Sequence, residues 1–149
     1  MPDPPLRVKR LRPSARLPER ATPDSSGLDL YADLEAEGGA AQLGLQPQLI
    51  PTGIAIAVPR GYEVQLRPRS GLSRRGVVVA FGTVDADYRG EVFVNMSAPG
   101  AQGAHFAITH GDRIAQLVVA PVTLSAVEEV AELDDTTRGE GGFGSTGTR

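Results

Sequence analysis

This sequence of 149 residues contains no cysteine and no tryptophan, and its only lysine is Lys9. Without cysteine the chain can form no disulfide, no thiol nucleophile and no Cys-ligated zinc site. The two histidines, His105 and His110, lack the spacing and the neighbouring ligands of a metal site, so we expect them to be structural or exposed. No stretch is apolar enough to span a membrane and no signal peptide is visible, which favours a cytoplasmic protein without a membrane partner.

The composition narrows the class of protein further. A formal net charge of −3 and an isoelectric point near 5.4 argue against a nucleic-acid polymer as partner, because general nucleic-acid binders are normally basic. The length suits one domain. Its core has to be built from Val, Leu, Ile and Ala, since aromatic residues make up only 5% of the chain.

Short strands dominate the expected fold. The 18 glycines and 12 prolines interrupt the chain at short intervals, which favours strands and turns over long helices. Apolar residues alternate or run together in about ten short segments, such as residues 62–68, 77–84 and 114–122. We therefore expect an all-β jelly roll, or distorted β-barrel, formed by residues 1–133. The last part of that range, residues 123–133, fits another strand or a weak helix.

The C-terminal segment, residues 134–149, has a different composition. Residues 138–147 contain one cation, one aromatic ring, two hydroxyl groups and five glycines, and such a segment cannot build a core. Its backbone N–H groups and hydroxyls can bind phosphate oxygens, Arg138 can neutralise charge, and the ring of Phe143 can stack on a flat group. These features indicate a flexible arm that closes over a phosphorylated ligand.

Four further polar clusters lie at the ends of expected strands, where functional sites are usually placed. They are residues 25–30, Arg69-Ser70-Gly71, residues 82–90 and residues 111–117. Their residues also have structural alternatives. Arg69-Ser70-Gly71 fits a helix N-terminus, Asp85 and Asp87 fit turn residues, and Gln116 fits a buried amide.

Together and in this order, these clusters and the C-terminal arm resemble the five motifs of the trimeric deoxyuridine triphosphatases (dUTPases). Arg69-Ser70-Gly71, residues 85–90, residues 111–117 and the arm match closely, so the resemblance covers nearly the whole chain. It implies a jelly-roll homotrimer with three active sites between subunits. One subunit would supply the first, second and fourth motifs, a second subunit the third motif, and a third subunit its arm.

The resemblance also implies the reaction, which is hydrolysis of dUTP to dUMP and pyrophosphate. This reaction limits uracil in DNA and supplies dUMP for dTMP synthesis. Asp85 would hold and deprotonate the water that attacks the α-phosphorus. The implied cofactor is Mg²⁺, which is usually held by substrate phosphates and one or two carboxylates, and Asp29 would reach it through water.

Other motif residues are implied to bind the rest of the substrate. Phosphate contacts fall to Arg69, Ser70, Gly71, Gln116, Arg138, Ser145 and Thr146, with Arg113 in support. The base and sugar would meet the segment that contains Ala80, Phe81, Gly82, Val84 and Asp85, which is similar to a uracil-reading hairpin, together with Tyr88 under the deoxyribose and Phe143 stacked on the base.

Two other functions remain to be weighed. A dCTP deaminase resembles this family in fold and trimer, but its catalytic Glu aligns with Asn95, and an amide cannot shuttle a proton. A non-catalytic trimeric jelly roll that binds nucleotides would not need the water-activating Asp85.

Overall fold

The computed structural model describes residues 4–100, 106–142, 144 and 147 of the chain. These residues form ten strands, one short α-helix and one 3-10 turn, and none of their helices is long and apolar enough to cross a membrane. The elements in chain order are β1 (Arg7–Arg10), β2 (Leu28–Tyr31), η1 (Glu35–Glu37), β3 (Ala40–Leu43), β4 (Gln48–Ala57), β5 (Tyr62–Arg67), α1 (Ser70–Ser73), β6 (Val78–Val79), β7 (Gly82–Val84), β8 (Glu91–Ser97), β9 (Phe106–Thr109) and β10 (Arg113–Pro121).

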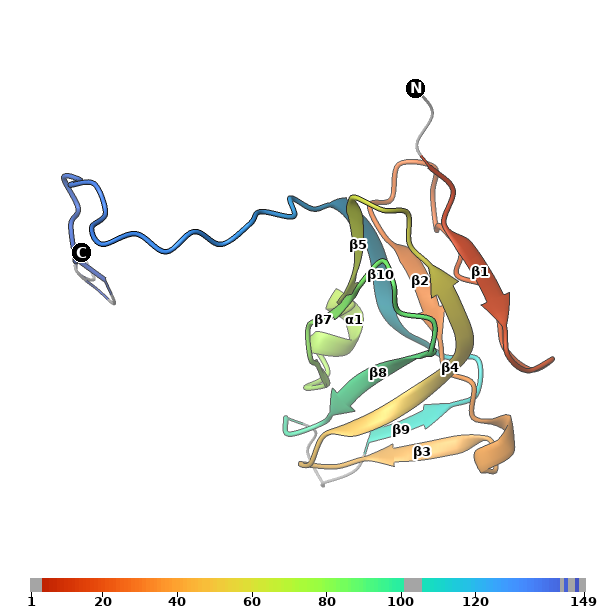
Figure 1. Cartoon of the computed structure of the whole chain (residues 1–149). Helices are drawn as coiled ribbons and strands as arrows, with labels where there is room; N and C mark the ends of the chain where they lie inside the picture. Colours follow the sequence, from red (N-terminus) through yellow and green to blue (C-terminus); the bar gives the residue numbers. More distant parts are fainter. Residues whose placement is uncertain (1–3, 101–105, 143, 145–146, 148–149) are drawn as a thin grey trace.

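Two four-stranded antiparallel sheets and one two-stranded ribbon build the folded core (Figure 1). The first sheet has the strand order β1-β4-β8-β6, the second has the order β2-β10-β5-β7, and β3 pairs with β9. Buried side chains from both sheets and from the ribbon join in one apolar cluster. The fold is a jelly roll, which confirms the all-β prediction.

The alternating pattern of the strands decides which side chains enter this core. In β5, Val64 and Leu66 are buried, whereas the intervening polar side chains remain partly exposed. β10 lies between β2 and β5 and buries Ile114 and Leu117 completely. The core consists of Val, Leu, Ile, Ala and Met side chains with one Tyr, as the low aromatic content of the sequence requires.

The apolar run over residues 77–84 forms two short strands that belong to different sheets. β6 pairs with β8 in the first sheet, and β7 pairs with β5 in the second. The chain therefore crosses from one sheet to the other at Ala80 and Phe81, and β6 and β7 do not form a hairpin with each other. A continuous apolar pattern marks strands but does not say which neighbours they pair with.

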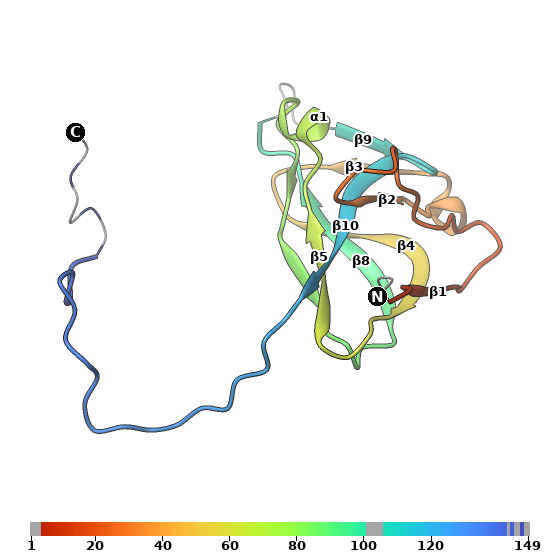
Figure 2. The same ribbon diagram turned by 90° about the horizontal axis from the view of Figure 1, so that it is seen from above.

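The last strand ends at Pro121, and the chain then leaves the sheets in an extended course (Figure 1; Figure 2). Residues 123–133 form neither the strand nor the helix that their pattern suggests, and their side chains are exposed. In this single chain they continue directly into the C-terminal arm.

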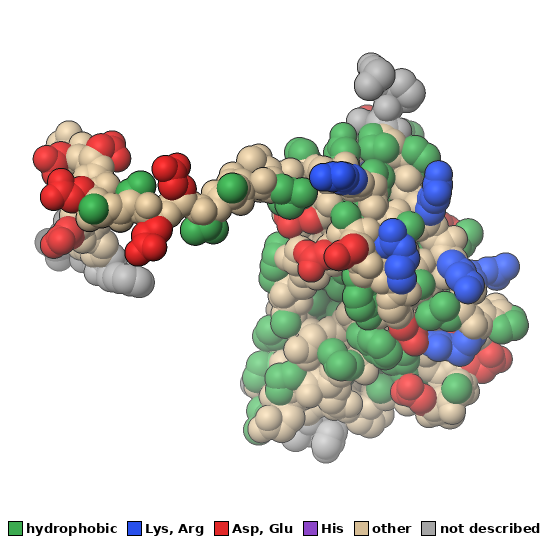
Figure 3. All heavy atoms as spheres, in the orientation of Figure 1, with side chains coloured by type: hydrophobic (Ala, Val, Ile, Leu, Met, Phe, Trp, Pro, Cys, Tyr) green, Lys and Arg blue, Asp and Glu red, His purple; other side chains and the backbone are tan. Residues whose placement is uncertain are grey.

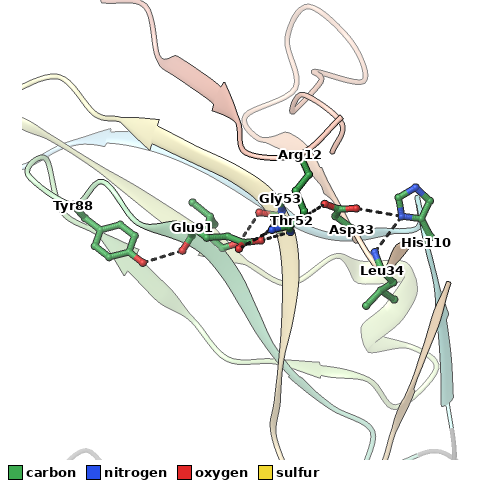
Figure 4. Close-up of polar contacts among 9 residues, drawn as sticks. Arg12, Asp33, Leu34, Thr52, Gly53, Tyr88, Glu91 and His110 are labelled. Atoms are coloured by element: carbon green, nitrogen blue, oxygen red, sulfur yellow. Dashed lines mark hydrogen bonds and ion pairs between the residues drawn. The ribbon is translucent and has the colours of Figure 1, made fainter. Parts of the chain in front are cut away.

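A network of charged side chains ties four segments of the core together (Figure 4). Arg12, after β1, donates from Nε to Asp33 Oδ2 at 2.8 Å and from Nη1 and Nη2 to the two carboxylate oxygens of Glu91 at 3.1 and 2.5 Å. The backbone N–H of Gly53 also donates to Glu91, at 2.9 Å. Gly53 has a φ of +68°, and a Cβ at this position would overlap the carboxylate of Asp33. The network therefore depends on glycine at this point of β4.

These contacts shift the pKa of each carboxyl group. Hydrogen bonding from Arg12 lowers the pKa of Glu91, against the opposing effect of burial. Burial raises the pKa of Asp33, but the nearby Ser14 side chain and the Arg12 guanidinium outweigh it, so that the net pKa lies below its ordinary value. Both groups are thus held in the charged form in the folded protein.

The lowered pKa values predict a loss of stability in acid. In the unfolded chain both carboxyl groups titrate near their ordinary values of about 4, so their stabilising contribution is complete above that pH and disappears as the pH falls through the lower folded values. Thermal unfolding should be followed from about pH 7 to about pH 3. The melting temperature of Asp33→Asn should fall less steeply in acid than that of the wild type, while Asp24→Asn, at an exposed position, should follow the wild type. Equal slopes for Asp33→Asn and the wild type would contradict this account.

Candidate functional site

One cluster of predicted site residues gathers where β2 and β10 lie side by side and β5 ends. Asp29 of β2 lies opposite Gln116 of β10, which in turn pairs with Arg67 at the end of β5. The carboxylate of Asp29 is 3.2 Å from Nε of Arg69 and 3.6 Å from Nη1 of Arg113. Arg69 also donates to the backbone carbonyl of Arg113 at 3.1 Å. Two cations are thus held beside one acid, at a place that a polyanion could approach.

The side chain of Gln116 is fixed at the same place. It donates from Nε2 to the carbonyl of Pro68 at 2.9 Å, and a Cβ on Gly27 would come within 2.6 Å of its Oε1. Next to it, Ser70 and Gly71 open the single turn of α1 with exposed side-chain positions. The structural alternative for Arg69-Ser70-Gly71 is therefore correct in part: the motif begins a helical turn, but the Arg69 side chain pairs with Asp29 instead of extending freely into solvent.

A second group of predicted residues lines a shallow hollow of about 270 Å³ that runs along β7 and the turn after it. Asp85 is exposed at its rim, directly after the last residue of β7, and Tyr88 lines it from the same turn, in which Tyr88 N–H donates to the Asp85 carbonyl at 3.2 Å. Leu66 and Phe93 form part of the apolar wall. The hollow offers an exposed carboxylate beside an aromatic ring.

The expected base-reading segment is the crossing between the two sheets. The N–H of Ala80 donates to the Asn95 carbonyl at 2.9 Å, so this N–H is engaged within the chain. The side chain of Phe81 is 61% exposed. Gly82 and Val84 are held in β7 opposite Leu66 and Val64 of β5.

The two groups of residues lie at opposite ends of β5. Val84 pairs with Val64, so Asp85 lies near the level of Glu63, whereas Arg69 and Ser70 follow the far end of the strand at Arg67. At about 3.3 Å per residue, this register puts Asp85 more than about 13 Å from the phosphate-type cluster. One copy of the chain therefore does not bring Asp85 together with Ser70 and Gln116.

The remaining predicted residues lie elsewhere or outside the described part of the chain. Arg138 is in the extended arm and donates to the Gly141 carbonyl at 2.7 Å. His110 has a structural role, since its Nδ1 accepts a hydrogen bond from Leu34 N–H at 3.1 Å and lies 3.6 Å from Asp33. The predictions for Phe143, Ser145, Thr146 and His105 concern positions outside the described residues.

Glu91 lines the hollow beside Tyr88 and is not among the site residues predicted from the motifs. One feature of the sequence could have indicated this residue, because Glu91 directly follows Arg89-Gly90 and begins a strand. A charged side chain that is half-buried at such a position needs a partner. Its partner Arg12 is 79 residues away in the sequence, and no local pattern joins the two.

The sequence and the fold of this chain match those of known proteins. The family model described as dUTPase matches residues 13–147. The chain belongs to the dUTPase family. It is 53% identical to the deoxyuridine 5'-triphosphate nucleotidohydrolase of Maricaulis maris over 89% of this chain and 88% of that protein, and 48% identical to the enzyme of the same name from Syntrophotalea carbinolica over 95% and 96%.

Solved dUTPases share the fold. The dUTPase of Staphylococcus bacteriophage 80alpha, in a structure with dUpNHpp, superposes with a TM-score of 0.86 at 29% identity, covering 97% of this chain and 99% of that one. A dUTPase mutant from phage phi11 of S. aureus, in which a structural Mg(II) ion is coordinated, has a TM-score of 0.76 at 26% identity, covering 87% and 98%.

The arrangement of the acidic residues in this dUTPase chain indicates how it could bind a metal ion. Among the described residues, no three His, Asp or Glu side chains are close enough to one another to enclose an ion. Asp29 is the one carboxylate in the cluster with Arg69 and Arg113, and both of its oxygens face these cations. This donor set fits an ion that arrives on phosphates and keeps its waters, and it does not fit a metal held by the protein alone.

Proposed function

We propose that this protein hydrolyses dUTP to dUMP and pyrophosphate, and that it does so as a homotrimer with shared active sites. The observation that carries the proposal is the match of the dUTPase family over residues 13–147, together with an exposed acid at position 85 and a cation and amide cluster at the end of β5. The same reaction keeps uracil out of DNA and supplies dUMP for dTMP synthesis.

Asp85 performs the central step. Its exposed carboxylate accepts a hydrogen bond from a water molecule and takes its proton as the water oxygen attacks the α-phosphorus. The bond between the α-phosphorus and the bridging oxygen to the β-phosphorus breaks, and pyrophosphate leaves. A carboxylate in this role contributes a rate factor of about 10²–10⁴, since water is a poor nucleophile at neutral pH.

The cluster at the end of β5 binds the triphosphate. Arg69 is oriented by Asp29, and Gln116 is oriented by Pro68, so that their donors are in place before the substrate arrives. Such preorganised donors stabilise charge that develops on phosphate oxygens. Ser70 and Gly71 add a hydroxyl and backbone donors, Arg113 supports the cluster, and the arm supplies Arg138, Ser145 and Thr146.

Mg²⁺ would reach this site with the substrate. Asp29 would contact the ion through water, while the phosphates hold it directly, and the bound ion would neutralise part of the charge of the triphosphate. With the two cations Arg69 and Arg113 beside the single carboxylate of Asp29, this cluster keeps an excess of positive charge before the substrate binds.

The base and sugar bind near the sheet crossing and the hollow. Backbone groups of residues 80–84 form hydrogen bonds with uracil. Because the N–H of Ala80 is already bonded within the chain, these hydrogen bonds come from the carbonyl of Ala80 and from the groups after it. Tyr88 lies under the deoxyribose and leaves no room for a 2′-hydroxyl, and Phe143 stacks on the base when the arm closes.

The separation within one chain supports an assembly of several copies, which we propose to be a trimer. Because Asp85 is more than about 13 Å along β5 from the cluster with Ser70 and Gln116, the acid that serves one triphosphate has to come from a neighbouring subunit. The segment that leads to the arm supports this, since its apolar side chains Leu124 and Val127 are 73% and 99% exposed in the single chain. Acidic side chains lie along the arm, and Lys and Arg gather near β1 on the core (Figure 3).

The first test of the reaction is Asp85→Asn. Pyrophosphate release should be measured with dUTP, dCTP, dTTP and UTP, and the wild type should act on dUTP. The variant should lose turnover by about 10²-fold or more, because the amide cannot accept the proton, while calorimetry shows dUpNHpp bound as before. Normal turnover by the variant would contradict the mechanism, and formation of uridine products from dCTP would indicate a deaminase instead.

The arm is tested by truncation after Leu133. The shortened protein should unfold at the same temperature as the full chain, since the described residues beyond Pro121 add nothing to the apolar core. Its turnover should fall severely, because water is no longer excluded and the arm donors are gone. Full activity of the truncated protein would remove the arm from the mechanism.

A further inference from the structure

We propose that Arg12 and Glu91 are positioning residues that hold Tyr88, and through it the turn that begins at Asp85, in the geometry that admits deoxyribose. This inference rests on the proposed function, in which Tyr88 faces the sugar. Neither residue belongs to the motif contacts assigned above, and Arg12 lies far from the hollow in sequence.

The contacts of Tyr88 begin the argument. Its hydroxyl donates to the backbone carbonyl of Glu91 at 2.9 Å, and its ring lies so close over Gly90 that a Cβ there would overlap the ring. The residue is 44% exposed, so little other packing fixes the ring. The position of Tyr88 therefore depends on where the backbone at Gly90 and Glu91 is held.

The side chain of Glu91 determines that position. Glu91 starts β8 opposite Ala55 of β4, just where the register of the two strands shifts. At this irregular point its carboxylate provides a second anchor, since it accepts from Gly53 N–H at 2.9 Å and from both terminal nitrogens of Arg12. A two-point contact between a guanidinium and a carboxylate restricts orientation as well as distance.

Arg12 is in turn fixed from its other side. Its Nε donates to Asp33, whose side chain is only 2% exposed, whereas the Arg12 side chain is 34% exposed. Arg12 thus bridges an acid that follows β2 and an acid that begins β8. Figure 4 shows the continuous path from Asp33 through Arg12 and Glu91 to Tyr88. Loss of charge on either side of the Arg12–Glu91 pair loosens the anchor of Tyr88 without removing any atom of Tyr88.

The test measures sugar selectivity, which a purely structural role would not change. Glu91→Gln keeps the backbone carbonyl and the size of the side chain but loses the charge, and Arg12→Met removes the partner. In each variant the ratio of kcat/KM for dUTP over UTP should fall about tenfold, because a small displacement of a positioning group changes the discrimination between two sugars. The dissociation constant of the ribose counterpart divided by that of dUpNHpp should fall with it.

A double-mutant cycle shows whether the effect passes through Tyr88. Tyr88→Phe removes the hydroxyl bond to Glu91, so adding Glu91→Gln to Tyr88→Phe should change the ratio by less than about twofold. The control is Thr52→Val, which removes a buried hydrogen bond of 2.5 Å to the Val92 carbonyl on the same strand pair. This control should lower the melting temperature and leave the ratio as in the wild type.

The outcomes separate the inference from the proposed function. If Glu91→Gln and Arg12→Met are folded and keep the wild-type ratio, or if Glu91→Gln acts equally in the Tyr88→Phe background, the positioning role is wrong. If Thr52→Val lowers the ratio as much as the two network variants, the effect is one of stability and the role is again wrong. If the wild type does not hydrolyse dUTP, the proposed function fails, whereas binding of the two analogues still tests the positioning.

Discussion

The pairing of β7 with β5 is the constraint on which the function of this fold depends. Its register places Asp85 near one end of β5, while the other end leads into Arg69 and Ser70. The acid and the phosphate donors that we propose for the reaction are thereby kept apart within each chain. Because the two sheets share one apolar core, this separation cannot close without unpairing β7. In the function that we propose, neighbouring copies therefore complete each site, and the trimer is part of the proposed chemistry.

Each half of the site is held by charge and hydrogen bonds, because both halves lie at the surface, where packing alone fixes little. At the end of β5, Asp29 orients Arg69 while the Pro68 carbonyl holds Gln116. At the hollow, Glu91 anchors the turn that carries Tyr88 and is itself anchored by Arg12. Such rigid support fixes the geometry of a site shared between subunits, since the side chains of each subunit are held in position before the subunits assemble.

The all-β fold, most of the strands and the dUTPase motifs can be recognised from the sequence because each depends on a local pattern. Alternating apolar side chains indicate β5, and the five motifs in their order indicate the dUTPase family. The division of residues 77–84 between two sheets was not predictable, because pairing partners lie far apart in the chain. The same holds for the ion pairs of Arg12 with Asp33 and Glu91, which are 21 and 79 residues away. Residues 123–133 carry a pattern that fits a strand or a weak helix, and they pair with no strand in the described part of the chain.

The central claim, that one site is built from several chains, is tested most directly by mixing two inactive variants. Asp85→Asn lacks the acid but retains its arm, whereas the chain truncated after Leu133 retains the acid but lacks the arm. After unfolding and refolding together in equal amounts, about a quarter of the sites should combine an intact acid from one subunit with an arm from another, and about a quarter of the wild-type turnover should return. If the mixed trimers form and remain as inactive as the separate variants, acid and arm are supplied by the same chain and the account is contradicted.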